Sequence, residues 1–230
     1  MTDYTATRDR VEDYFDRTAT TVWERLTSDA PVSGVRATVR AGRDRMRAVM
    51  LAQLPDDLRG CRVLDAGCGT GAAAVELAQR GADVVAVDIS PALIEIARKR
   101  APSGLAGTIN WQAGDMLDPA LGRFDHVIAM DSMIYYAPSD IARLLGDLGA
   151  RVSGKVVFTL PPRTPLLMAM FRAGKLFPRA DRSPQMVPQN AGDVRKAMRK
   201  AGVSGELAAK ARVKSGFYIS TAMVFQGGQV

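Results

Sequence analysis

The chain has 230 residues, 47% of them hydrophobic, and carries a formal net charge of +7. This length suits one well-filled core, no apolar run reaches the roughly 20 residues of a membrane span, and the polar N-terminus is unlike a signal peptide. Cys61 and Cys68 indicate neither a disulfide framework nor a metal site, so we expect a cytoplasmic protein without a metal centre of its own.

Two helical segments are predicted first, at residues 5–29 and 33–54, and together they form an N-terminal helical arm over residues 1–54. In the second segment, apolar residues recur at helical spacing while arginines follow another face. Such an arginine stripe is usually a solvated helix face. Because it lies just before the nucleotide-like region that follows in the chain, we keep it as a candidate anion contact. The arginines are Arg36, Arg40, Arg43 and Arg47.

From Cys61 onward, strands alternate with helices, and this order predicts a mainly parallel, doubly wound α/β sheet. Residues at about 161–190 interrupt the order, because they are apolar, basic and rich in proline, and we expect a lid-like insertion within the domain of residues 55–230. Seven strands are expected, at 62–67, 83–90, 108–115, 124–131, 155–161, 206–213 and 218–226. Helices are expected at 71–81, 91–100, 139–151 and 191–201.

The stretch VLDAGCGTG places Gly67, Gly69 and Gly71 between a strand and a helix. Glycine accepts positive φ and lets a ligand approach the backbone, and a helix N-terminus offers free N–H groups. The spacing is not G-x-G-x-x-G, because Ala74 occupies the last position, and no Gly-Lys-Ser/Thr of a P-loop follows. The glycines alone therefore leave a dinucleotide, a phosphate or an amino-acid carboxylate open as the ligand.

Three aspartates narrow this choice. Asp65 lies inside the first strand, where an unpaired carboxylate is costly, so it needs a partner near the loop. Asp88 ends the second strand, where a carboxylate can accept both hydroxyls of a ribose, and Asp115 ends the third, within reach of an adenine edge. Each alone is more often a cap or turn residue. Together they indicate one nucleotide-like site outside the carboxyl ends of the strands.

Over residues 60–160 the chain resembles the class I S-adenosylmethionine (SAM)-dependent methyltransferases, with VLDAGCGTG as first motif, VVAVDIS as acidic second strand, AGD as third motif and FDHVIAMDSM beneath the methyl donor. The resemblance implies a Rossmann-like fold and SAM as cofactor. Arg40-Ala41-Gly42 also resembles an R-x-G of quinone O-methyltransferases, whose arginine reaches the SAM carboxylate. The cofactor contacts so implied are Arg40, Asp65, Gly67, Gly69, Gly71, Asp88, Ile89, Asp115, Met116 and Met130.

The flanks YFDRTATTVWERLTSD, VSGVRATVRAGRDRMR and RVKSGFYISTAMVF resemble the magnesium-protoporphyrin IX O-methyltransferases of (bacterio)chlorophyll synthesis. With the core motifs, this resemblance covers nearly the whole chain. It implies transfer of the SAM methyl group to a porphyrin propionate, giving a methyl ester. A propionate is already ionised at neutral pH, so no strong general base is required. Magnesium arrives inside the substrate.

Arg36 and Arg43 are predicted to clamp the propionate, and Tyr14 and Tyr136 to wall a porphyrin pocket. Plant and cyanobacterial members carry W-x-R-I-Y and D-x-x-I-H-Y, whose tyrosine and histidine are proposed acid/base groups. These positions fall on Thr27 and Tyr135, the two candidate catalytic residues here. We expect Tyr135 to orient the carboxylate and His126, which lies within a strand, to be structural.

Three alternatives stay open. A quinone or phenol is one alternative substrate, and a non-catalytic SAM- and porphyrin-binding carrier is an alternative to an enzyme. RNA methylation is suggested by thirteen Lys or Arg against three acids between Lys155 and Lys214. We nevertheless expect no nucleic-acid partner, because DSMIYYAP stands where many nucleic-acid methyltransferases carry N/D-P-P-Y. The partners expected are the porphyrin, the porphyrin-binding subunit of magnesium chelatase and, through a peripheral contact, the photosynthetic membrane.

Overall fold

The computed structural model describes residues 4–16, 34–165, 167–169 and 186–227. Its strands are β1 (Arg62–Ala66), β2 (Asp83–Asp88), β3 (Thr108–Ala113), β4 (His126–Ala129), β5 (Lys155–Leu160), β6 (Gly205–Ser215) and β7 (Tyr218–Gly227). They form one sheet in the order β3-β2-β1-β4-β5-β7-β6. The first five strands in this order pair in parallel, and β7 and β6 extend the edge by antiparallel pairing. The predicted mainly parallel seven-stranded sheet is confirmed.

Helices connect the strands, and their ends follow local capping signals. The Ser90 hydroxyl accepts the Leu93 N–H at the start of one helix, where Pro91 is the first helical residue, and Asn190 accepts the Asp193 N–H at another. The helices are α1 (Tyr4–Tyr14), α3 (Gly34–Leu51), α4 (Ala72–Gln79), α5 (Pro91–Arg100), α6 (Pro138–Gly149) and α8 (Ala191–Ala201), with short 3-10 turns η2 (Pro119–Leu121) and η3 (Met133–Tyr135).

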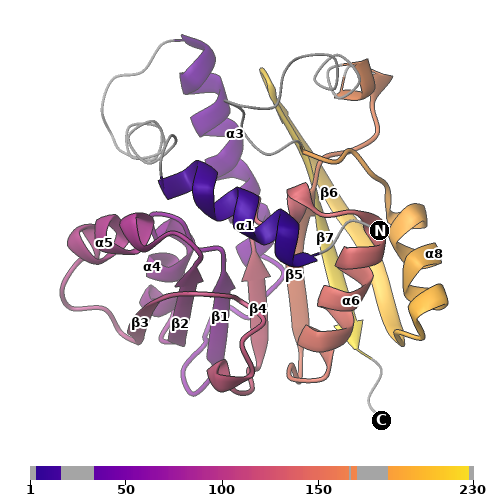
Figure 1. The fold of residues 1–230 in the computed structure, drawn as a ribbon. Coiled ribbons are helices and arrows are strands. Elements are labelled where there is room, and N and C mark those ends of the chain that lie inside the picture. The colour runs from indigo at the N-terminus through magenta and orange to yellow at the C-terminus, as the bar shows by residue number, and fades with distance from the viewer. Residues whose placement is uncertain (1–3, 17–33, 166, 170–185, 228–230) are drawn as a thin grey trace.

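The core has two halves, one on each face of the sheet. Val85 and Val87 of β2 join the cluster under α6 and α8, whereas Val84 and Ala86 of the same strand join the cluster under α3, α4 and α5. Successive side chains of a strand point to opposite faces, so a strand covered on both sides is apolar throughout. The result is a three-layer α/β arrangement (Figure 1).

The N-terminal elements lie at the carboxyl ends of the strands. Figure 1 shows α1 across the tips of β1 and β4, with α3 rising beside the β6–β7 hairpin. The first predicted helix is helical over its described residues, as α1 to Tyr14 and then as a π-helical turn to residue 16, and the second ends at Leu51 rather than at residue 54. Residues 17–33 and most of the expected insertion lie outside the described residues. No helix within the described ranges is long and apolar enough to cross a bilayer.

Candidate functional site

A cavity of about 370 Å³ lies at the carboxyl ends of the parallel strands, between the glycine loop and the helices α1 and α3. Parallel α/β sheets bind ligands at this edge. The predicted cofactor contacts that line it are Arg40, Asp65, Gly67, Gly69, Asp88, Ile89, Asp115, Met116 and Met130. The predicted substrate and catalytic residues that line it are Arg43, Tyr135 and Tyr136.

The glycine loop supplies bare backbone to this cavity. Gly67 and Gly69 have φ values of 78° and 55°, in the region that favours glycine. A Cβ at Gly67 would lie 2.4 Å from the Ser132 Cβ, whereas a Cβ at Gly69 would meet no described residue within 4 Å. The loop is therefore closed on the Ser132 side and open at Gly69.

Gly71 does not belong to the described cavity lining, so its place among the cofactor contacts stays a prediction. It precedes α4 with φ 84°, and a Cβ there would lie 2.4 Å from the Cη2 atom of Trp111. The residue is a glycine because the start of α4 packs closely against the β3 tryptophan.

Gly71→Ala is expected to lower the free energy of unfolding by about 2–4 kcal/mol, because a positive φ and an overpacked contact each contribute about 1–2 kcal/mol. The matched control is Gly104→Ala, since Gly104 has φ 74° and a Cβ added there would meet open space. We expect that control to lose about 1 kcal/mol in urea denaturation. An equal loss of unfolding free energy in the two variants would show that the Trp111 side chain moves aside and that packing does not require glycine at position 71.

Two buried carboxylates stand behind the loop. Asp88 accepts the Gly69 N–H at 2.7 Å and the Ser90 N–H at 3.0 Å, and burial raises its pKa to about 6. Asp65 is 1% exposed, and its Oδ2 atom has no hydrogen-bond partner among the described residues. Burial, with the nearby Asp88 charge, raises the pKa of Asp65 to about 7. An orphaned buried carboxylate oxygen beside a cavity is suited to a cationic ligand group.

Helix α1 covers the third aspartate. The Tyr4 hydroxyl donates to Asp115 Oδ1 at 2.6 Å, and Arg8 donates to Oδ2 at 3.1 Å. Tyr4 also stacks on Tyr136, with ring centroids 5.1 Å apart and planes 20° apart. Tyr4 and Arg8 line the cavity but were not predicted, because no local motif links residues more than 100 positions from Asp115.

The arginine stripe of α3 meets the cavity along only part of its length. Arg40, Arg43 and Arg47 line it, and Arg47 pairs with Asp44 at 2.9 Å and with Glu76. Arg36 is exposed in the first turn of α3 and is not in the described lining. Its predicted place in a carboxylate clamp gains no support from the described lining, because Arg36 lies in the first turn of α3 and the cavity-lining arginines follow it along the helix.

The other predicted site residues also differ in whether they line the cavity. Tyr14 packs edge-on against Phe15, and Phe15 rather than Tyr14 lies in the described cavity lining. Thr27 lies outside the described residues. His126 accepts the Lys155 N–H on its Nδ1 atom at 3.1 Å, within the sheet. Burial raises the pKa of Tyr135, so its hydroxyl stays protonated and can donate.

Asp131 is the main residue that the sequence analysis missed. It follows β4 and lines the cavity, where its carboxylate bonds Arg43 of α3 and Tyr218 of β7. Its position directly after Met130 was visible in the FDHVIAMD motif. The partners were not, because they lie 88 and 87 residues away along the chain.

Comparison with known proteins agrees with this geometry. A family model described as Magnesium-protoporphyrin IX methyltransferase C-terminus matches residues 129–226, and one described as Methyltransferase domain matches residues 63–152. The magnesium-protoporphyrin O-methyltransferase of Rhodobacter capsulatus is 58% identical over 97% of this chain and 98% of its own length. The Synechocystis protein of the same name is 29% identical over 91% of this chain and 92% of its own length.

Solved structures extend the match to the fold. The crystal structure of magnesium protoporphyrin IX methyltransferase from Synechocystis with bound SAH aligns with a TM-score of 0.76 and 26% identity, over 98% of this chain and 100% of that one. A geranyl diphosphate methyltransferase aligns with a TM-score of 0.67 at 15% identity, covering 95% of this chain and 98% of its own, which is a likeness of fold alone. The chain belongs to the magnesium-protoporphyrin O-methyltransferase family.

Proposed function

We propose that this protein transfers the methyl group of SAM to a propionate carboxylate of magnesium-protoporphyrin IX, giving the monomethyl ester in (bacterio)chlorophyll biosynthesis. The observation that carries the proposal is the 58% identity, along almost the full length of both chains, to the Rhodobacter capsulatus magnesium-protoporphyrin O-methyltransferase. The protein is a SAM-dependent enzyme, and neither a quinone, a phenol nor RNA accounts for this match as well.

The cavity residues fit SAM. SAM carries an ammonium group, which suits the orphaned Oδ2 of Asp65, and two ribose hydroxyls, which suit the carboxylate of Asp88. Gly67 and Gly69 leave backbone exposed for the amino-acid end. We assign Asp115 and Met116 to the adenine and Arg40 to the SAM carboxylate, as the motifs imply. When bound, SAM supplies an electrophilic methyl group on a positively charged sulfur.

The protein then has to orient a nucleophile that is already an anion. A propionate needs no general base, so proximity and exclusion of water supply most of the catalysis. Tyr135 lines the cavity as a protonated hydroxyl and can donate a hydrogen bond to the carboxylate. We assign Arg43 to the same carboxylate and Tyr136 to the porphyrin wall.

We also propose that the N-terminal arm closes over bound cofactor, because α1 holds Asp115 through Tyr4 and Arg8. The double variant Tyr4→Phe, Arg8→Gln is expected to release S-adenosylhomocysteine about 10-fold faster, since two hydrogen bonds to a carboxylate are lost. Stopped-flow displacement measures this rate. The control is Arg10→Gln, whose side chain, among the described residues, bonds within α1 at Ala6 and Thr7. An unchanged rate of S-adenosylhomocysteine release in the double variant would show that the N-terminal arm does not close over bound cofactor through Tyr4 and Arg8.

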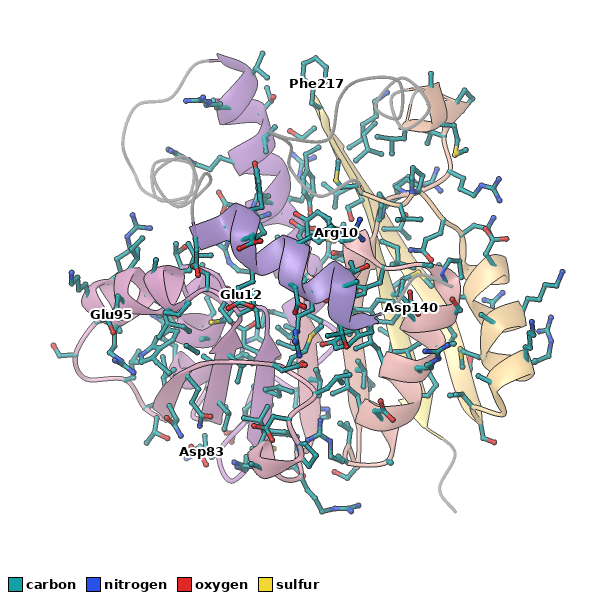
Figure 2. All side chains as sticks on the ribbon, in the orientation of Figure 1. Arg10, Glu12, Asp83, Glu95, Asp140 and Phe217 are labelled. Carbon is teal, nitrogen blue, oxygen red and sulfur yellow. The ribbon has the colours of Figure 1, made fainter. Side chains whose placement is uncertain are left out.

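Delivery of the porphyrin by a chelatase subunit and a peripheral contact with the photosynthetic membrane follow from the resemblance. The membrane contact is supported by the net charge of +7 and by two exposed apolar side chains, Val35 at 54% and Phe217 at 64%. Phe217 projects at the end of the molecule toward which the parallel strands β1 to β5 point (Figure 2). Co-sedimentation with anionic vesicles, lost at high salt, tests it, and no sedimentation at low salt would reject it.

A mass-spectrometric assay with SAM and magnesium-protoporphyrin IX tests the function, with metal-free protoporphyrin in parallel. Gain of one methyl group on the metallated porphyrin supports it. SAM binding with neither porphyrin methylated, even with the chelatase subunit added, would reject the substrate and favour a carrier.

A further inference from the structure

The carboxylate of Asp131 is held by side chains from three separate elements. Thr159 of β5 donates to it at 3.0 Å, Tyr218 of β7 at 3.1 Å and Arg43 of α3 at 2.5 Å. The Asp131 side chain is 10% exposed and the Arg43 side chain is 20% exposed. The ion pair is therefore largely removed from water, on the wall of the cavity.

The backbone at Asp131 is in an unusual conformation. Its φ of 57° is the single positive value at a non-glycine position among the described residues. The Asp131 N–H donates to the Thr159 hydroxyl at 2.8 Å, and this bond holds the conformation. Strained residues that the surroundings fix in this way cluster at functional sites.

The cluster also fixes α3 against the hairpin. A Cβ at Gly42 would lie 2.8 Å from the Tyr218 ring, so the helix approaches β7 closely at the residue before Arg43. The Ser215 hydroxyl donates to the Thr38 carbonyl at 2.7 Å, one turn earlier. The position of the Arg43 guanidinium relative to the cavity is therefore set by Asp131 and Tyr218 together.

The ion pair of Asp131 and Arg43 also lies beside Tyr135. The Asp131 charge adds to burial in raising the Tyr135 pKa, and the Arg43 charge opposes it. The residues assigned to the propionate, Arg43 and Tyr135, thus share one anionic neighbour. Arg43 lines the cavity while Asp131 balances its positive charge.

This balance matters for the reaction, in which charge disappears. The propionate oxygen attacks the SAM methyl carbon, the O–CH₃ bond forms, and the S–CH₃ electron pair leaves with sulfur. An anion and a cation thereby become a neutral ester and a neutral thioether. An unbalanced guanidinium would stabilise the propionate more in the ground state than in the transition state, which tightens binding and slows the chemical step.

We propose that Asp131 is a positioning residue that holds Arg43 in place and balances its charge, so that Arg43 orients the propionate without overstabilising it. This inference rests on the proposed function. It goes beyond that function because it names Asp131, which contacts Arg43 and not the propionate, as the residue that sets how KM and kcat depend on Arg43.

The test is steady-state kinetics of Asp131→Asn, because asparagine also tolerates a positive φ and keeps the shape of the side chain. We expect the KM for magnesium-protoporphyrin IX to fall about 3-fold and kcat to fall about 10-fold, with SAM affinity unchanged. The control is Glu76→Gln, which removes the negative charge of the neighbouring ion pair between Glu76 of α4 and Arg47 and is expected to leave both constants within about 2-fold.

Arg43→Gln added to Asp131→Asn removes the guanidinium that has lost its Asp131 partner, and kcat is expected to rise above that of the single variant. Loss of kcat with a higher KM, or a double variant no faster than Asp131→Asn, would overturn the inference and leave Asp131 a structural residue. Inactivity of the wild-type protein would instead reject the proposed function, and the inference with it.

Discussion

Asp88→Ala is expected to weaken SAM binding by about 100-fold or more and to abolish methylation at ordinary SAM concentrations. The carboxylate is assigned two ribose hydroxyls, and a hydrogen bond to a charged group is worth about 1.5–3 kcal/mol. The change also removes the acceptor of the Gly69 and Ser90 N–H groups, so the loop loses its anchor as well. Isothermal titration with SAM measures the effect.

The matched control for this variant is Asp83→Ala. Asp83 begins the same strand, is exposed, and lies at the opposite end of the sheet from α1 (Figure 2). It bonds Thr108 on the neighbouring strand, so the control removes an aspartate from β2 without touching the cavity. Retained SAM affinity in Asp88→Ala would place the ribose elsewhere.

Asp65→Asn is expected to stabilise the folded protein at pH 8 while weakening SAM binding. Burial raises the pKa of Asp65 to about 7, against about 3.9 in an unfolded chain. Between these values the folded state binds more protons than the unfolded state, so this group lowers stability progressively as the pH rises from about 4 to 7. Above pH 7 the full cost is present, on the order of 4 kcal/mol.

Asparagine carries no charge, so the variant avoids this cost. Its stability advantage should be largest at pH 8 and absent near pH 4, and thermal unfolding at the two pH values measures it. SAM affinity should fall about 10-fold or more, because the ammonium group loses its anionic partner. Asp83→Asn, on an exposed carboxylate, serves as control. A variant less stable than wild type at pH 8 would mean that the hydrogen bond from the Ala74 N–H to the Asp65 carboxylate outweighs the cost of burying its charge.

The parallel sheet and the cofactor side of the site were predictable from sequence, because both follow from short segments. An apolar strand, a glycine turn and a helix determine where Asp65 and Gly67 lie, and the next strand places Asp88 beside them. Parallel strands bring their carboxyl ends to one edge whatever the rest of the chain does. Gly71 is the exception, since its role depends on Trp111, which lies on another strand.

The substrate side was decided by tertiary packing. Helical spacing places Arg36 on the same helix face as Arg40 and Arg43. Which of these arginines line the cavity depends on where along its length α3 passes it, and no local sequence pattern specifies that position. It depends on Gly42 against Tyr218 and on Arg43 against Asp131, contacts between segments far apart in the chain. Sequence periodicity therefore determined which residues share a face, whereas only long-range contacts decided which part of that face meets the ligand.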